Sequence, residues 1–450
     1  MAATRDLTKG NVTTTMLLFA LPLILGNLLQ QFYNIADTLI VGRFLGAQAL
    51  AAVGSSYTLM IFLNSILLGM CMGCGILFSI CYGRGDMPGL RNNVYISFVL
   101  IGAFSLLLNG AVFWLLDDIL MWLQVPADVL APMGEYLWYI FWGILFTFLY
   151  NYLASLLRAV GNSTVPLVFL GVSAVVNVAL DLLFIISFGW GVMGAAVATV
   201  AAQALAAVGL AVYTVLKAPQ LLPGAGNFAF TWPAASQVLR FASLTCMQQS
   251  VMNFGILMVQ GLVNSFGTVI MAAFAAAVKI DSFAYMPVQD FGNAFSTFIA
   301  QNVGAKRFDR IKQGIRSAFV TSTVFSCAVS LLVWIYAADL MGIFIQPGET
   351  VIVAAGVQYL RIEGAFYCGI GCLFLFYGLY RAVKLPEMSL VLTVISLGTR
   401  VALAYCLAAV PSIGVVGIWW AVPIGWALAD LTGAVYYWQN RDTLQRKLSV

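Results

Sequence analysis

One stretch near the start of this chain organises the rest, and it reads Asn34-Ile35-Ala36-Asp37-Thr38-Leu39-Ile40-Val41-Gly42-Arg43-Phe44-Leu45-Gly46. It closes an apolar run that begins near Thr13, so the carboxylate of Asp37 lies inside that run. A carboxylate at membrane depth costs roughly 2.5–3.5 kcal/mol on insertion scales and is rare outside functional sites. Asp37 is therefore the first candidate for a functional residue.

The composition is that of a membrane protein. Of the 450 residues, 62% are hydrophobic and only 8% are charged, whereas soluble domains carry about 25% charged residues. Apolar runs recur from end to end, which predicts an all-α polytopic membrane protein rather than a globular enzyme with one anchor. The first run is longer than the apolar core of a signal peptide and lacks a small-residue cleavage site, so no cleaved leader is expected. The net charge of +4 comes from basic residues at the ends of apolar runs and does not indicate nucleic-acid binding.

Twelve transmembrane helices are predicted, because a spanning helix needs about 20 apolar residues. They cover residues 13–40, 48–80, 93–116, 134–158, 165–188, 191–216, 237–263, 270–302, 315–338, 354–380, 387–410 and 413–438. Most of the 21 Lys and Arg residues lie in the connections on one side, for example Arg84, Lys306 and Arg381. The opposite connections carry acidic residues such as Asp117 and Glu349. Since cytoplasmic loops are enriched in Lys and Arg, both termini are predicted to be cytoplasmic, in the cell's inner (plasma) membrane.

An internal repeat divides the chain into two pseudo-symmetric halves of six helices. Arg158-Ala159-Val160 falls on Arg381-Ala382-Val383, and Gly191-Val192-Met193-Gly194 falls on Gly414-Val415-Val416-Gly417, both with a shift of 223 residues. The expected organisation is a first lobe over 1–216, a cytoplasmic linker over 217–236, a second lobe over 237–440 and a cytoplasmic tail over 441–450. Parallel repeats of this kind usually place a substrate between the halves.

Three polar residues of the first half, Asp37, Asp181 and Thr199, are expected to share one layer in the outer part of the bilayer. The first and fifth predicted helices both run outward, and Asp37 and Asp181 each lie about six residues before the outer end, roughly 9 Å at 1.5 Å per residue. Asn177 precedes Asp181 by one helical turn, so both side chains lie on one face, and Thr199 reaches a similar depth on the sixth helix. No Lys or Arg lies in the interior of these six helices. The carboxylates are therefore interpreted as a site for a proton or cation, with a capped or salt-bridged structural role as the alternative.

Other polar residues within the helices have more than one interpretation. Pro22 removes a backbone hydrogen bond and allows the first helix to bend. A group of polar residues on the first and seventh helices either lines a central cavity or pins neighbouring helices together: Gln30, Tyr33, Asn34, Gln249 and Asn253. The second half carries charges of both signs, so mutual ion pairing is expected there, with direct ion coupling as the alternative: Lys279, Asp281, Asp290, Arg361, Glu363, Arg400 and Asp430.

The sequence offers little for metal or redox chemistry. Histidine is absent, which removes His-based triads, imidazole relays and the commonest metal ligand. Cys71-Met72-Gly73-Cys74 has CxxC spacing, but it lies in a Gly- and Met-rich helix with no second pair nearby, so a packing role is favoured. Neither a metal site nor a cofactor is expected.

Several segments in order resemble the multidrug and toxic compound extrusion (MATE) family over essentially the whole chain. They are Phe19-Ala20-Leu21-Pro22, Asp37-Thr38 with Val41-Gly42-Arg43, Ala51-Ala52-Val53-Gly54, Leu157-Arg158-Ala159-Val160-Gly161-Asn162, Asn177-Val178-Ala179-Leu180-Asp181 and Ala300-Gln301-Asn302-Val303-Gly304-Ala305. The resemblance implies a two-lobed, twelve-helix antiporter that exports cationic, often aromatic, compounds against inward H⁺ or Na⁺. It also implies a protein that acts in the bilayer as a monomer.

The resemblance also assigns roles to residues. It implies a first-lobe cation site of Asp37, Asn177, Asp181 and Thr199, with Pro22 as the bend in the first helix and Asn151 as a further polar residue on the fourth. Branches that couple through the second lobe as well carry acids on helices seven and ten. This chain has none on helix seven and only Glu363 near the start of ten, which favours a first-lobe-coupled, DinF-like or related bacterial branch.

Three other functions are weighed against an exporter. A flippase for lipid-linked saccharides would need a cationic cavity, whereas the first half of this chain is acidic. An intramembrane enzyme without histidine would have to use Asp37 and Asp181 as an aspartyl dyad, but no protease-like motif surrounds either residue. A channel would conduct passively, with no dependence on an ion gradient.

Overall fold

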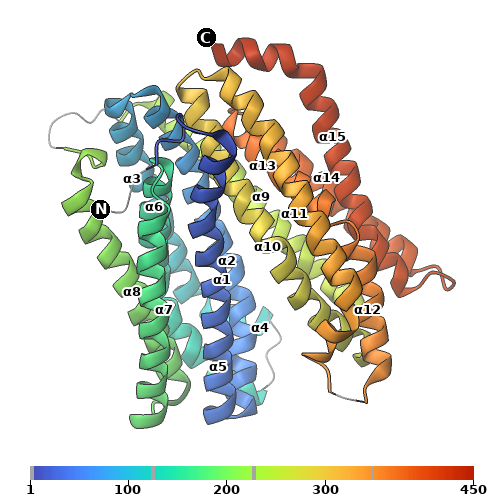
Figure 1. The fold of residues 1–450 in the computed structure, drawn as a ribbon. Helices are drawn as coiled ribbons and strands as arrows, with labels where there is room; N and C mark the ends of the chain where they lie inside the picture. The colour runs from blue at the N-terminus through green and yellow to red at the C-terminus, as the bar shows by residue number, and fades with distance from the viewer. Residues whose placement is uncertain (1–4, 123–126, 225–229, 347, 450) are drawn as a thin grey trace. The chain divides into compact units, whose positions relative to one another are not determined.

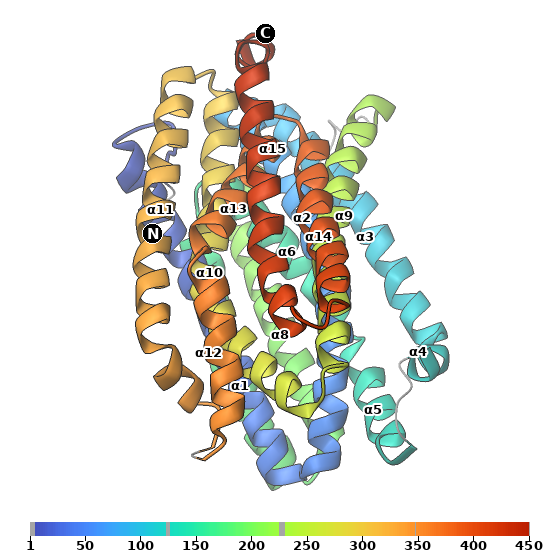
Figure 2. The ribbon, with the colours of Figure 1, turned by 90° about the vertical axis from the view of Figure 1, so that its right-hand side faces the viewer.

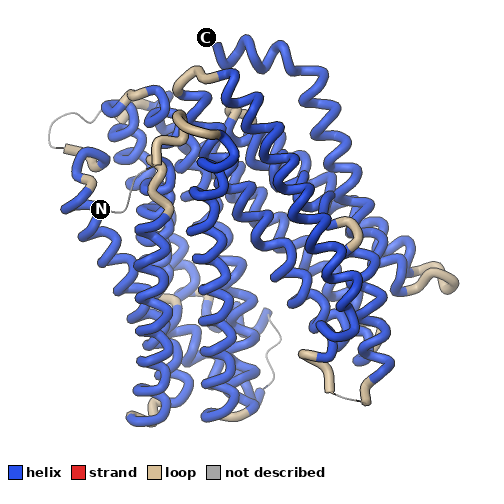
Figure 3. Tube along the Cα trace, in the orientation of Figure 1, coloured by secondary structure: helices blue, strands red, loops and turns tan. Residues whose placement is uncertain are grey.

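The computed structural model describes residues 5–122, 127–224, 230–346 and 348–449, and within them the chain is helical with no strand (Figures 1 and 3). The cytoplasmic linker expected over 217–236 is described except for residues 225–229, which lie outside these ranges. The elements are α1 (Val12–Leu45), α2 (Ala47–Arg84), α3 (Met87–Trp114), α4 (Leu116–Trp122), α5 (Ala127–Ile140), α6 (Gly143–Ala159), α7 (Thr164–Asp181), the π-helix η1 (Leu182–Ser187), α8 (Gly191–Lys217), the 3-10 turn η2 (Pro219–Leu221), α9 (Trp232–Asn264), α10 (Thr268–Gly304), α11 (Phe308–Gly342), α12 (Thr350–Gly364), α13 (Tyr367–Ala382), α14 (Pro386–Ala408) and α15 (Val415–Ser449).

The helices match the predicted spans closely. In the described part of the chain, nine helical segments are long and apolar enough to cross a membrane, and the number rises to eleven if each of two bent helix pairs is counted as one span. The pairs are α5 with α6, bent by 44°, and α12 with α13, bent by 51°, and they occupy equivalent places in the two halves. The remaining predicted span, 237–263, lies in α9, a continuous helix whose middle carries polar residues such as Gln248 and Gln249.

The chain forms two compact units, and α1 and α9 each contribute to both. Unit 1 comprises the described residues of Met1–Asp6 and Leu25–Cys246, and unit 2 comprises Leu7–Ile24 and Met247–Val450. Helix α1 therefore passes from unit 2 to unit 1 just after Pro22, although it is continuous over 34 residues. The lobe boundaries expected from the repeat stay a prediction.

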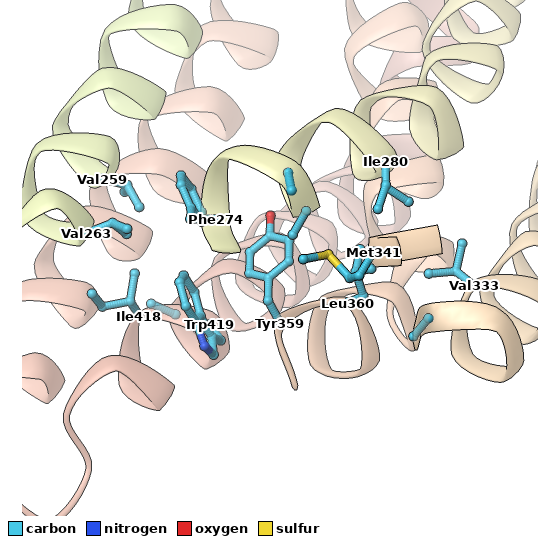
Figure 4. Packing of buried hydrophobic residues seen from close by; sticks show 14 of the residues in the cluster. Val259, Val263, Phe274, Ile280, Val333, Met341, Tyr359, Leu360, Ile418 and Trp419 are labelled. Atoms are coloured by element: carbon cyan, nitrogen blue, oxygen red, sulfur yellow. The ribbon is translucent and has the colours of Figure 1, made fainter. Parts of the chain in front are cut away.

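Unit 2 is built around an aromatic cluster (Figure 4). Phe274 of α10 and Trp419 of α15 stack with centroids 5.5 Å apart, and Tyr359 of α12 packs edge-on against both. Helices α14 and α15 run side by side in this unit (Figure 2). The cluster fixes the second half of α12, which carries Glu363.

In unit 1, α2 and the start of α9 approach closely through two glycines one helical turn apart. A Cβ on Gly69 would lie 2.6 Å from Cα of Cys246, and one on Gly73 would collide with the carbonyl of Phe241. This Gly-x-x-x-Gly pattern allows close helix contact in membranes. Cys71 and Cys74 are buried free thiols beside it, so the Cys71–Cys74 segment lies in a helix-packing surface.

Gly73→Ala should destabilise the protein by about 1–3 kcal/mol, because the added methyl group must push α9 away from α2. Thermal unfolding in detergent measures the effect. Gly54→Ala, on the same helix with no atom within 4 Å of the new Cβ, is the matched control. Equal stability of the two variants would contradict the close packing.

Candidate functional site

The two carboxylates of the first half meet in unit 1. Asp37 of α1 is 9% exposed and Asp181, the last residue of α7, is fully buried. Their side chains lie within hydrogen-bonding reach of each other. Because an ionised carboxylate only accepts hydrogen bonds, such a bond requires one of the two groups to be protonated.

Asn177 connects Asp181 to α8. With one orientation of its amide, Nδ2 donates to Oγ1 of Thr199 over 3.3 Å. With the other, Nδ2 donates to Oδ2 of Asp181 over 3.2 Å and the amide oxygen accepts from the backbone N–H of Thr199 over 3.3 Å. The second orientation satisfies both ends of the amide. In either case the structure brings together the four residues that the sequence singled out.

Local backbone geometry sets the position of Asp181. The α-helix α7 ends at this residue and continues as the π-helix η1. A π-helical turn is wider than an α-helical one and occurs often at functional sites. The side chain of Asp181 therefore lies at the junction between two helical geometries, close to where Asn177 of α7 meets Thr199 of α8.

Two tyrosines, Tyr33 and Tyr136, lie near the carboxyl pair, and Tyr57 lies beside Asn34 and Tyr33; of the three, only Tyr33 was singled out from the sequence. Tyr33 precedes Asp37 by about one turn of α1 and lies close enough to both carboxyls to interact electrostatically. Tyr136 of α5 is 6% exposed and also lies near both, while Tyr57 of α2 accepts a hydrogen bond from Asn34 over 3.3 Å. A signal existed for one of them, since Tyr136 falls on Tyr359 with the repeat shift of 223 residues.

The remaining predicted polar residues are placed differently. The amide of Asn151 donates to the carbonyl of Thr147, one turn earlier in its own helix. Gln30 is exposed, and Gln249 and Asn253 are half-buried residues of unit 2. The central cavity expected from these residues stays a prediction.

Unit 2 holds a second group of buried acids. Asp281 of α10 and Glu363 of α12 are 5% and 1% exposed, and Oδ2 of Asp281 accepts a hydrogen bond from Tyr359 over 3.5 Å. Arg400 of α14 is the cation whose charge acts on both. Oδ1 of Asp281 and Oε2 of Glu363 are buried without a hydrogen-bond partner. Asp290, which lies on α10 like Asp281, is also buried.

Lys279 and Arg361, two further cations for which ion pairing was expected in this half, have aromatic partners. Nζ of Lys279 lies 6.0 Å from the ring centroid of Phe344, and the guanidinium of Arg361 lies 5.2 Å from that of Trp334. The ion pairing expected in the second half stays a prediction, with Arg400 as the cation whose charge acts on Asp281 and Glu363. Among the residues that the structure describes, no three His, Cys, Asp or Glu side chains are placed to hold a metal ion.

Comparison with known proteins identifies relatives along the whole chain. The MatE family model matches residues 22–183 and again 244–406, so each half of the repeat matches it separately. The probable multidrug resistance protein YpnP of Bacillus subtilis is 30% identical over 391 residues, with 87% of each chain covered. An FAD transporter of Shewanella oneidensis is 25% identical, covering 97% of this chain and 96% of that one. A crystal structure of a MATE protein in the bent conformation superposes with a TM-score of 0.92 at 20% identity, covering 99% and 98% of the two chains.

Proposed function

The chain belongs to the MatE family of multidrug transporters, and from that premise we propose that it is a secondary active exporter driven by H⁺ or Na⁺. Its substrates are cationic and aromatic compounds, which leave the cell as the ion enters. The observation that carries this proposal is the buried pair of Asp37 and Asp181 in unit 1. The interiors of the six surrounding predicted helices contain no Lys or Arg, so the compensating charge has to come from outside the protein.

The pair can exchange one charge for another. Two ionised carboxylates within hydrogen-bonding reach of each other repel in a medium of low dielectric constant. Binding one proton or cation relieves this repulsion. The proton or Na⁺ that enters therefore weakens the hold of the site on a cationic substrate. By thermodynamic reciprocity the substrate weakens the binding of the ion to the same degree, as antiport requires.

Asp37 gives this exchange a conformational consequence, because it lies on a helix that belongs to both units. Neutralising its charge changes which position of the second half of α1 is most stable. The missing N–H of Pro22 leaves α1 more easily bent near the residue where it changes units. The adjoining carboxyls also resemble the dyad of an aspartyl enzyme, but membership of a transporter family disfavours that function.

The test is ethidium uptake into inverted membrane vesicles, the direction that corresponds to export from the cell, under separately imposed H⁺ and Na⁺ gradients. We expect concentrative movement with one of the two gradients and none without either. Movement that follows only the ethidium gradient would indicate a channel. No ethidium movement under any gradient, together with movement of a lipid-linked saccharide, would indicate a flippase.

Thr199→Val should weaken the coupling mildly, because it removes one hydroxyl and no charge. The affinity for the driving ion should fall about fivefold, corresponding to about 1 kcal/mol for one hydrogen bond. Ion-dependent binding of ethidium to purified protein measures this. Thr214→Val is the matched control, since its hydroxyl donates to the carbonyl of Leu210 in the same helix α8.

The orientation in the membrane is part of the proposal. If both termini are cytoplasmic, a cysteine introduced at Glu349 will react with an impermeant thiol reagent in intact cells, and one introduced at Lys306 will not. Each is compared with the unmodified chain, whose eight native cysteines set the background. The opposite pattern of labelling would reverse the orientation. We also propose that the transporter lies in the plasma membrane and works as a monomer.

A further inference from the structure

A guanidinium in unit 2 binds the backbone of the segment that precedes α1. Arg310, in the first turn of α11, donates from Nη1 to the carbonyl of Gly10 over 2.7 Å. Its Nη2 donates to the carbonyls of Leu7 and Lys9 over 3.1 and 3.0 Å. The planar fork of arginine offers five N–H donors in a fixed geometry. One side chain therefore gathers three carbonyl oxygens of a single short segment.

Buried groups reinforce this attachment. Asn302 of α10 is fully buried; its amide oxygen accepts from Nε of Arg310 over 3.2 Å, and its Nδ2 donates to the carbonyl of Leu7 over 3.2 Å. The side chain of Leu7 is also fully buried. The guanidinium lies 5.6 Å from the ring centroid of Phe298. The segment is thus held by a satisfied polar network over an aromatic ring.

The attachment continues into α1 itself. Oγ1 of Thr13, in the first turn of α1, lies 2.6 Å from Oγ of Ser317 on α11. All of these partners belong to unit 2. From Leu25 onward, however, α1 belongs to unit 1, where it carries Asp37. Asp37 follows Thr13 along this one continuous helix.

We propose that Arg310 and Asn302 are positioning residues for transport, which fix the start of α1 in unit 2 throughout the transport cycle. This rests on the proposed function. When the start of α1 is fixed in unit 2, a movement of the second half of α1 caused by ion binding at Asp37 is transmitted to unit 2. Without that attachment, the first half of α1 moves together with its second half, and ion binding at Asp37 no longer affects the conformation of unit 2. The guanidinium stays charged at all physiological pH values, so the attachment does not itself respond to the driving proton.

A disulfide across the attachment tests whether it stays closed. In Thr13→Cys/Ser317→Cys, copper phenanthroline as oxidant removes two electrons and two protons from the thiols to link α1 to α11. We expect the cross-link to form readily and the oxidised protein to export ethidium at the rate of the reduced one. The unmodified chain under the same oxidant controls for the native cysteines. Loss of export on cross-linking would overturn the proposal, because the start of α1 would then have to leave unit 2.

Loss of the guanidinium tests whether the attachment matters for coupling. Arg310→Gln should bind ethidium as the unmodified protein does but lose about tenfold in gradient-driven export, within the 5–150-fold range of typical coupling. Arg310→Lys should recover part of the loss. Arg316→Gln removes one exposed positive charge from the same helix and should export normally. In Arg310→Gln, the disulfide should form more slowly and, once complete, restore export.

The outcomes separate this proposal from the proposed function. Normal gradient dependence in Arg310→Gln, or a coupling loss that complete cross-linking does not restore, would refute the role of Arg310. If Arg310→Gln does not fold, the cross-linked protein with Arg310 intact still decides the question. An unmodified chain that exports nothing under either gradient contradicts the function instead, while the rate of cross-linking still reports on the attachment.

Discussion

Asp37→Asn and Asp181→Asn will each give a protein that folds and reaches the membrane but no longer exports substrate against a gradient. Asparagine keeps the shape of aspartate and most of its hydrogen-bonding capacity, so the packing around Tyr33 and Tyr136 is preserved. The carboxyl pair can then no longer gain and lose a charge. Because antiport depends on ion and substrate changing each other's affinity, concentrative export should fall to the level of vesicles without the transporter.

The measurement combines ethidium accumulation in vesicles with pH- and Na⁺-dependent binding to purified protein. In both variants, binding should lose its dependence on the driving ion. Asp117→Asn is the matched control, since Asp117 is an exposed carboxylate on α4 of the same unit. If both site variants export at the unmodified rate with unchanged gradient dependence, the carboxyl pair is not the coupling site.

Arg400→Gln will destabilise unit 2 more than the removal of charge at Arg361 or Asp281. Arg400 compensates two buried carboxyl groups, those of Asp281 and Glu363. Removing a partner from a buried charge cluster costs roughly 3–5 kcal/mol, because the remaining charges stay desolvated. Arg400 is itself half-buried, so the lower end of that range is expected.

Thermal unfolding in detergent tests this expectation. Arg361→Gln removes a cation that is exposed and lies over Trp334, so it should cost no more than about 1 kcal/mol. The loss of stability in Asp281→Asn should lie between those of Arg361→Gln and Arg400→Gln, because this variant leaves one carboxyl group, that of Glu363, near one guanidinium, that of Arg400. A well-folded Asp281→Asn protein that binds substrate but ignores the ion gradient would move the coupling site to unit 2.

One difference between equivalent positions of the two halves supports coupling in the first half. The repeat shift of 223 residues places Arg400 on Asn177. The acids of unit 2 thus have a cation of their own, while those of unit 1 have a neutral amide. A site that lacks an internal cation can accept an external one, and for this reason we place the exchange of charge at Asp37 and Asp181.

The sequence by itself determined the membrane-spanning helices and the candidate carboxylates. Both follow from free energies that belong to single residues, since every apolar side chain favours the bilayer and every buried carboxylate is costly there. The one-turn spacing of Asn177 and Asp181 needed only the period of a helix. The repeat was also visible as a constant shift, and the family model matches each half separately.

Only the tertiary structure decided which side chains meet. Tyr136 lies beside Asp37 and Asp181, and Lys279 lies over Phe344 rather than at an acid, because helix rotation and neighbours set these contacts. Local composition fixes neither of these contacts. The division of α1 between two units likewise depends on contacts such as those of Arg310 with Leu7, about 300 residues away in the chain.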